Sequence, residues 1–106
     1  MAKIKAGPSA VKELITYQSE AIVSRTLLNR SGGTATMFAF DQGQALSEHT
    51  APYDALIIAI DGKANIDLSG NRYSIEEGQM IRLTANEPHA IKALTRFMML
   101  LVMIRK

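Results

Sequence analysis

The chain has 106 residues, of which 47% are hydrophobic and 21% are charged, and its formal net charge is +2. This balance excludes an intrinsically disordered chain, because it supplies enough apolar surface for one modest core. The 12 Lys and Arg residues are scattered and do not alternate with aromatic residues, so we expect no nucleic-acid partner.

The absence of cysteine and the length of the apolar runs restrict the class further. Without cysteine there are no disulfides and no thiolate zinc sites, which agrees with a cytoplasmic location. The first residues lack the apolar stretch of a secretory signal peptide, so we do not expect export by that route. The longest apolar run, residues 97–104, is far shorter than the roughly 20 residues that cross a bilayer as a helix. We therefore expect a strand there and no membrane partner.

The first predicted elements are one short helical turn and two strands. Residues 9–14 are the one helical candidate, with Ser9 as its N-cap. Residues 22–28 are apolar and rich in β-branched side chains, which favours a strand. The sequence NRSGG at 29–33 then supplies a flexible turn into a second strand at 34–40.

The second half of the chain predicts further strands separated by tight turns. The run ALIIAI at 55–60 is almost continuously apolar, which predicts a strand buried on both faces. Residues 63–68 alternate apolar and polar side chains, and a turn follows them, so residues 64–75 are predicted to form a hairpin. The remaining predicted strands are 80–83, 91–94 and 97–104. Eight or nine short strands favour an all-β barrel or sandwich in one domain, residues 1–106, with the core barrel at about 20–106.

The most informative stretch is residues 43–62, GQALSEHTAPYDALIIAIDG. It resembles the first motif of the cupin family, which has a glycine, five residues, His-x-His, three or four residues, a glutamate, six residues and a glycine. His49 takes the place of the first histidine. Ala51 and Ala55 stand where the second histidine and the glutamate belong. The spacing of the motif is therefore intact, but two of its ligands are missing.

Residues 78–90, GQMIRLTANEPHA, resemble the second cupin motif. That motif has a glycine, five residues, Pro-x-Gly, two residues and a histidine. Thr84 replaces the proline, Asn86 replaces the second glycine and His89 occupies the histidine position. Asparagine is the best substitute for glycine where φ must be positive, so we expect the turn to be preserved.

The resemblance covers residues 33–104 and implies an all-β cupin fold, a double-stranded β-helix or jelly-roll barrel. Cupins usually hold a divalent metal on three histidines and one carboxylate. Because only His49 and His89 remain, the resemblance implies an incomplete metal site, with Zn, Ni, Fe or Mn at low occupancy. Without a metal, the two imidazoles are polar lining hydrogen-bonded to water or a ligand, or an acid–base pair.

Strand alternation predicts which neighbours share the pocket with the histidines. If residues 49–55 form one strand, alternate side chains point inward and Glu48 and Asp54 point away. No carboxylate then replaces the missing one. The predicted ligand pocket consists of His49, Ala51, Tyr53, Ala55 and His89.

Three functions remain open at this stage. The first is a small-molecule binding cupin without catalysis, a sensor or accessory protein, which explains the lost ligands directly. The second is a metal-dependent enzyme, of dioxygenase or isomerase type, that uses a two-histidine site. The third is an interaction module whose role is dimerisation. Because residues 97–104 are apolar on both strand faces, a homodimer is expected in any of these cases.

Overall fold

A computed structural model describes residues 4–105. In that range one short 3-10 helix, η1 (Val11–Glu13), precedes nine strands. The strands are β1 (Ile22–Arg30), β2 (Gly33–Phe40), β3 (Ala45–His49), β4 (Asp54–Asp61), β5 (Lys63–Leu68), β6 (Asn71–Glu76), β7 (Met80–Leu83), β8 (His89–Ala93) and β9 (Phe97–Ile104). Among these residues no helix is both long enough and apolar enough to cross a membrane.

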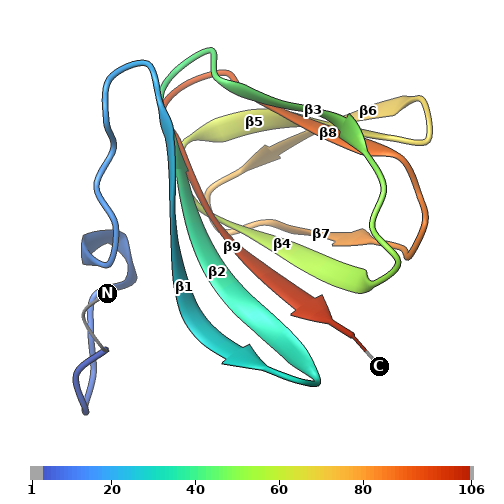
Figure 1. Ribbon diagram of the computed structural model, residues 1–106. Coiled ribbons are helices and arrows are strands. Elements are labelled where there is room, and N and C mark those ends of the chain that lie inside the picture. Colours follow the sequence, from blue (N-terminus) through green and yellow to red (C-terminus); the bar gives the residue numbers. More distant parts are fainter. Residues whose placement is uncertain (1–3, 106) are drawn as a thin grey trace.

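The strands form two antiparallel sheets that face each other (Figure 1). One sheet has the order β1-β2-β9-β4-β7 and the other the order β3-β8-β5-β6. After β2 the chain changes sheet at every connection except the β5–β6 hairpin. This course is that of a jelly-roll barrel, so the predicted all-β class and jelly-roll fold are confirmed.

Strand β4 shows how the sequence builds the core. Ala55, Ile57 and Ala59 are buried, whereas Leu56 and Ile58 between them are only partly buried. The prediction of a strand buried on both faces therefore holds for one face only, because the outward side of β4 is apolar but only partly buried. The largest side chains that are fully buried between the two sheets are Phe40, Ile57, Ile66, Phe97 and Met99.

Most predicted strands match the observed ones, but two local predictions are wrong. The turn η1 has three residues and begins after Ala10, which makes no side-chain cap, so Ser9 is not the N-cap. Residues 49–55 are not one strand, because β3 ends and β4 begins on either side of an irregular connection. That connection contains Pro52, which has no backbone N–H to donate to a sheet.

An N-terminal segment, residues 10–17, lies against the outside of the five-stranded sheet. Met37 and Met98 point away from the core between the sheets, yet their exposure is only 0% and 3%. The segment and Met98 line the same groove, and the guanidinium of Arg25 on β1 donates to the carbonyl of Leu14 at 2.8 Å. The segment therefore covers this part of the outer face.

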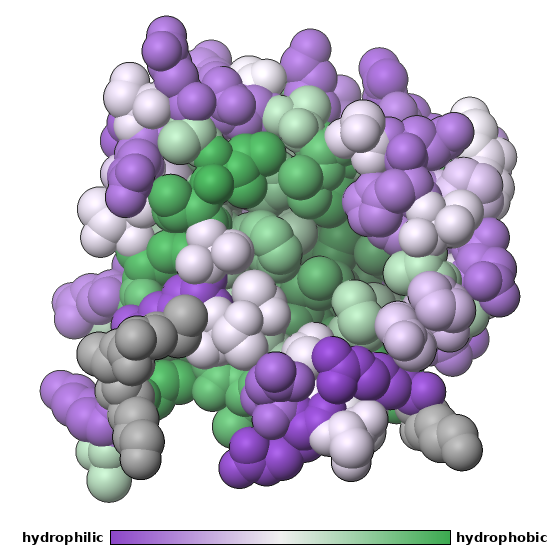
Figure 2. Space-filling view, viewed as in Figure 1, coloured by the Kyte–Doolittle hydropathy of each residue, from purple (hydrophilic) through white to green (hydrophobic). Residues whose placement is uncertain are grey.

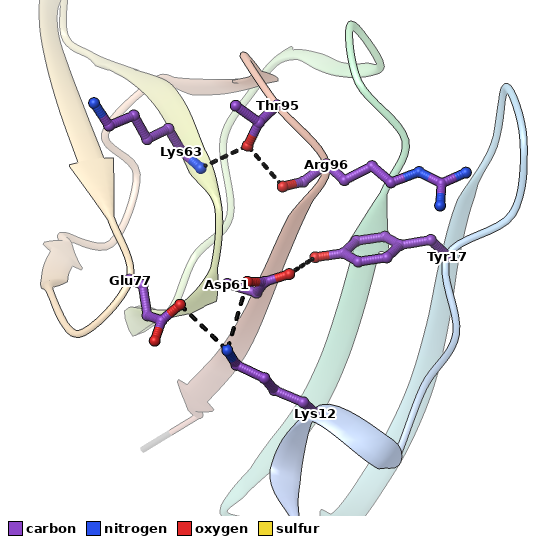
Figure 3. A network of polar contacts seen from close by, with 7 residues as sticks. All are labelled: Lys12, Tyr17, Asp61, Lys63, Glu77, Thr95 and Arg96. Atoms are coloured by element: carbon purple, nitrogen blue, oxygen red, sulfur yellow. Dashed lines mark hydrogen bonds and ion pairs between the residues drawn. The ribbon is translucent and has the colours of Figure 1, made fainter.

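Polar contacts attach the same segment to the end of the barrel (Figure 3). The Tyr17 hydroxyl donates to the carboxylate of Asp61 at 2.6 Å. The Lys12 Nζ atom lies 3.6 Å from a carboxylate oxygen of Asp61 and 3.3 Å from one of Glu77. The guanidinium of Arg96 lies over the Tyr17 ring, with its Cζ atom 5.3 Å from the ring centroid. Exposed ion pairs contribute little stability each, so the two ion pairs of Lys12 add little to this attachment.

Candidate ligand site

Pairing of two strands brings the two histidines together. His49 is the last residue of β3 and His89 is the first residue of β8, and the two are directly opposite in the antiparallel ladder. Their Nε2 atoms lie 3.0 Å apart. The ring centroids are 4.2 Å apart and the ring planes are inclined by 68°. The structure thus places these sequence-predicted residues in direct contact.

Backbone carbonyls fix the orientation of both rings. The Nδ1 atom of His49 lies 2.8 Å from the carbonyl oxygen of Ser47, and that of His89 lies 3.0 Å from the carbonyl oxygen of Glu87. A carbonyl oxygen only accepts hydrogen bonds, so each Nδ1 must donate. In two neutral rings both Nε2 atoms then present lone pairs to each other. The contact is favourable only when a hydrogen or a cation lies between them.

Below the histidine pair lies an interior cavity of about 110 Å³. Figure 2 shows an apolar area in the middle of this side of the molecule, between the two sheets of Figure 1 and framed by hydrophilic residues. All five predicted pocket residues line the cavity: His49, Ala51, Tyr53, Ala55 and His89. The rest of the lining is apolar and includes Phe38, Leu46, Ile57, Leu83, Ile91 and Leu101.

The part of the lining that comes from β2 and β9 was not predicted from the sequence. Phe38 on β2 and Leu101 on β9 face the cavity, and so do Met99 and Met103. The signal that was available is alternation, because the side chains at 97, 99, 101 and 103 share one strand face. Both faces of this strand are apolar, so alternation alone does not decide which face points towards the cavity.

The loops at the cavity mouth are tied to each other. Asn86 has a φ of 65°, as predicted for the residue that replaces a motif glycine. Its N–H donates to the carbonyl of Ala51 at 2.7 Å. The neighbouring N–H of Ala85 donates to the carboxylate of Asp54 at 2.8 Å. These bonds join the β3–β4 connection to the β7–β8 connection, so both cupin-like motifs build one rim.

The carboxylates near the histidines in sequence are engaged elsewhere. Asp54 accepts from the backbone of the opposite loop, and Glu87 accepts from the Ser69 hydroxyl at 2.9 Å. Glu48 is at an exposed position of β3. Within residues 4–105, no group of three or more His, Cys, Asp or Glu side chains is placed to hold a metal ion.

A four-ligand metal centre therefore does not fit these residues. With metal–nitrogen bonds of about 2.1 Å, the separation of 3.0 Å between the two Nε2 atoms corresponds to an angle of about 90° at a metal ion. That angle suits two neighbouring positions of an octahedral ion, which leaves about four positions without a donor from the described residues. The remaining surroundings are mostly apolar.

The two rings differ in exposure. His89 is buried, with an exposure of 7%, whereas His49 is exposed at the rim. Burial lowers the pKa of His89, and the neighbouring charge of His49 lowers it further, while the hydrogen bond to the Glu87 carbonyl and the Glu87 charge act in the opposite direction. The buried ring accordingly disfavours a positive charge that has no counter-ion.

A jelly-roll barrel with histidines at the mouth of an interior cavity is the architecture of the cupin class. The family model for the cupin domain matches residues 36–104. The chain belongs to the cupin family.

Solved structures agree with this assignment. The chain is 32% identical to a conserved protein of unknown function from Streptococcus pyogenes, with a TM-score of 0.91, covering 100% of this chain and 96% of that chain. It is also 32% identical to a cupin 2 conserved barrel domain protein from Leptotrichia buccalis, with a TM-score of 0.86, covering 90% of this chain and 46% of that chain. A cupin superfamily protein from Desulfitobacterium hafniense, 22% identical with a TM-score of 0.92 over 98% of this chain and 95% of that chain, shares the fold. No curated protein sequence matches the chain.

Proposed function

We propose that this cupin is a small-molecule binding protein, a sensor or accessory protein without a complete metal site. Its cavity takes an apolar ligand, and the His49–His89 pair is the polar end that orients it. The single observation that supports this proposal most is the interior cavity, apolar over most of its lining and polar at one end. This is the general character of small-molecule sites in proteins. Ala51 and Ala55, where other cupins have ligands, leave that space open.

A ligand screen on the intact chain tests the proposal. Small apolar molecules are added, and the methyl resonances of Ile57, Leu101 and Met99, which line the cavity, are followed by NMR. We expect saturable shifts in these three residues. The variant Ala55→Leu adds three carbon atoms inside the cavity and should abolish them. Ala45→Leu makes the same change at an exposed position of β3 and should not. A screen in which no molecule shifts the lining residues would refute the proposal.

The alternative is a metal-dependent enzyme of dioxygenase or isomerase type that uses two histidines. One observation favours it: each Nδ1 is held by a carbonyl, as is usual for histidines that bind metals through the other nitrogen. We expect instead that the purified protein contains well under one first-row metal ion per chain. Elemental analysis showing one ion per chain would favour the enzyme.

We also propose that the protein forms a homodimer through an outer face, defined as the outward side chains of β4, β7 and β9. These alternate with the cavity-lining residues and, apart from Asp54 and Arg82, are apolar. The residues of the outer face are Leu56, Ile58, Met80, Leu100, Val102 and Ile104. Two neighbouring side chains of opposite charge, Asp54 and Arg82, lie at its border and are exposed. A second copy related by a two-fold axis presents the same apolar residues and the same two charges. The outer face is therefore self-complementary, with Asp54 of one copy able to face Arg82 of the other.

A further inference from the structure

Tyr53 supplies a polar group to the cavity that is independent of the histidine pair. Among the described residues that line the cavity, only Tyr53 and the two histidines have a side chain that donates a hydrogen bond. Tyr53 and Ala55 both line the cavity, whereas Asp54 between them is exposed. The tyrosine therefore lies on the cavity side of the chain at the point where β4 begins.

The Tyr53 hydroxyl has no partner in the part of the chain that the structure describes. Within residues 4–105 it makes no hydrogen bond to a side chain or to the backbone, whereas the Tyr17 hydroxyl donates to Asp61. Tyr53 is half-buried, and no fully enclosed side-chain oxygen or nitrogen in the described range lacks a partner. The hydroxyl thus keeps contact with water in the unliganded chain. A ligand that displaces this water must accept the hydrogen bond in its place, because a donor left unpaired costs free energy.

The backbone on both sides of Tyr53 is held in place. On one side, the carbonyl of Ala51 accepts from the N–H of Asn86 at 2.7 Å. On the other side, the carboxylate of Asp54 accepts from the N–H of Ala85 at 2.8 Å. The hydroxyl is therefore carried by a segment whose conformation is set before a ligand arrives, which lowers the entropy cost of binding.

The cavity sets the size of the ligand's body. An apolar cavity of about 150 Å³ accepts benzene, so the volume of about 110 Å³ accommodates roughly four carbon atoms by proportion. The walls are aliphatic and aromatic side chains, among them Phe38, Leu46 and Ile57. An aliphatic body fits these walls, because it needs no hydrogen-bond partner there.

We propose that the ligand is a short aliphatic molecule of about four carbon atoms with one oxygen-bearing head group, and that the Tyr53 hydroxyl donates a hydrogen bond to that oxygen. This inference rests on the proposed binding function and names the residue that selects the head group. A carbonyl oxygen and a hydroxyl oxygen both accept such a bond, whereas a hydrocarbon does not. No covalent bond forms or breaks.

Three molecules of similar shape test the inference on the intact chain. They are 3-methyl-2-butanone, 3-methyl-2-butanol and 2,3-dimethyl-1-butene, in which a CH2 group takes the place of the ketone oxygen. Affinity is measured by NMR titration of the unmodified chain and of Tyr53→Phe. We expect Tyr53→Phe to weaken binding of the ketone, the alcohol or both by about three- to tenfold, the effect of one hydrogen bond, and to change binding of the alkene by less than about twofold. The oxygen compound that binds more tightly shows which head group the site takes.

Tyr73→Phe is the matched control for this substitution. It removes the same hydroxyl from a tyrosine that is 48% exposed and lies outside the cavity lining, so all three affinities should be retained. Without ligand, Tyr53→Phe should keep the free energy of unfolding of the unmodified chain, because its hydroxyl has no partner within residues 4–105 to lose. In the unmodified chain, the NMR signal of the ring carbon that bears the Tyr53 hydroxyl should shift with the ketone or the alcohol but not with the alkene. This signal decides even if Tyr53→Phe does not fold.

The other outcomes separate this inference from the proposed function. Unchanged affinity of Tyr53→Phe for the ketone and the alcohol would overturn the inference and leave a binding cavity. Equal weakening for all three molecules, or a clear loss of unfolding free energy, would also overturn it, because the side chain would then act through packing. If none of the three molecules binds but xenon enters the cavity, the inference alone fails. If xenon is also excluded, both proposals fail.

Discussion

His89 is the buried ring of the pair, and its burial predicts how stability depends on pH. The pKa of His89 is lowered from 6.5, first by burial and then by the charge of His49. The unfolded chain therefore binds this proton more readily than the folded chain. The free energy of unfolding is fully retained above about pH 6.5 and decreases as the pH falls below it. Denaturant unfolding at about pH 7.5 and about pH 5.5 measures this decrease.

The matched variants for this pH dependence are His89→Phe and His49→Phe. His89→Phe removes the buried titrating ring and should reduce the loss of stability at low pH. His49→Phe removes an exposed ring and leaves His89 buried, so most of the loss should persist. If both variants kept the full pH dependence, other groups would be responsible for it.

Two alanines at the cavity explain why the metal site is incomplete, and restoring their ligands should complete it. Ala51 and Ala55 line the same cavity as both histidines. We expect the double variant Ala51→His with Ala55→Glu to bind Ni²⁺ or Zn²⁺ at least about 100-fold more tightly than the parent, since loss of a supporting group alone typically costs 10- to 100-fold. Metal titration measures the change, with Ala51→His alone as the intermediate case. Equal affinity in parent and double variant would contradict this explanation.

In the β4–β5 turn, both the backbone conformation and the available space favour glycine at position 62. Its φ is +78°, and a Cβ atom there would overlap the backbone carbonyl oxygen of Arg96 in the β8–β9 turn. Gly43 has a similar φ of +83° but no atom within 4 Å of a Cβ. We expect Gly43→Ala to lower the free energy of unfolding by roughly 1 kcal/mol, the cost of the left-handed conformation. Gly62→Ala should lower it by at least about 3 kcal/mol, because backbone must also move. If denaturant unfolding showed the same loss of unfolding free energy for both variants, the contact between the β4–β5 and β8–β9 turns would not restrict position 62.

Local sequence patterns predict most of the strands, whereas the contact between the two histidines depends on which strands pair. The strand at 97–104 was predicted with its observed limits because an apolar run of that length has few other solutions. The motif spacing predicts one strand over 49–55, whereas Pro52 interrupts it. The histidine positions were visible in the motifs. The opposition of their Nε2 atoms was not, since it requires β3 to pair with β8, about forty residues further along the chain.

At the scale of the whole molecule, the outer face is an apolar surface that lies outside the core between the two sheets. The N-terminal segment lines a groove with Met98 at one side of it. The same segment forms a groove with Ile58 on β4. Farther from the segment, Met80 and Ile104 are 56% and 50% exposed. Contiguous apolar area of this kind on a protein surface usually marks an interface. A second copy is the occupant that we propose.

Light scattering after size-exclusion chromatography tests the dimer. We expect the unmodified chain to elute with twice the mass of one chain. Val102→Glu, in the middle of the outer face, and Met80→Glu, at its edge, should each shift the protein towards the monomer, because an unpaired carboxylate is unfavourable in an apolar interface. Tyr73→Glu is the matched control, since Tyr73 is 48% exposed on β6 of the other sheet. It should leave the dimer intact. A dimer lost in Tyr73→Glu but kept in the other two variants would place the interface on the four-stranded sheet instead.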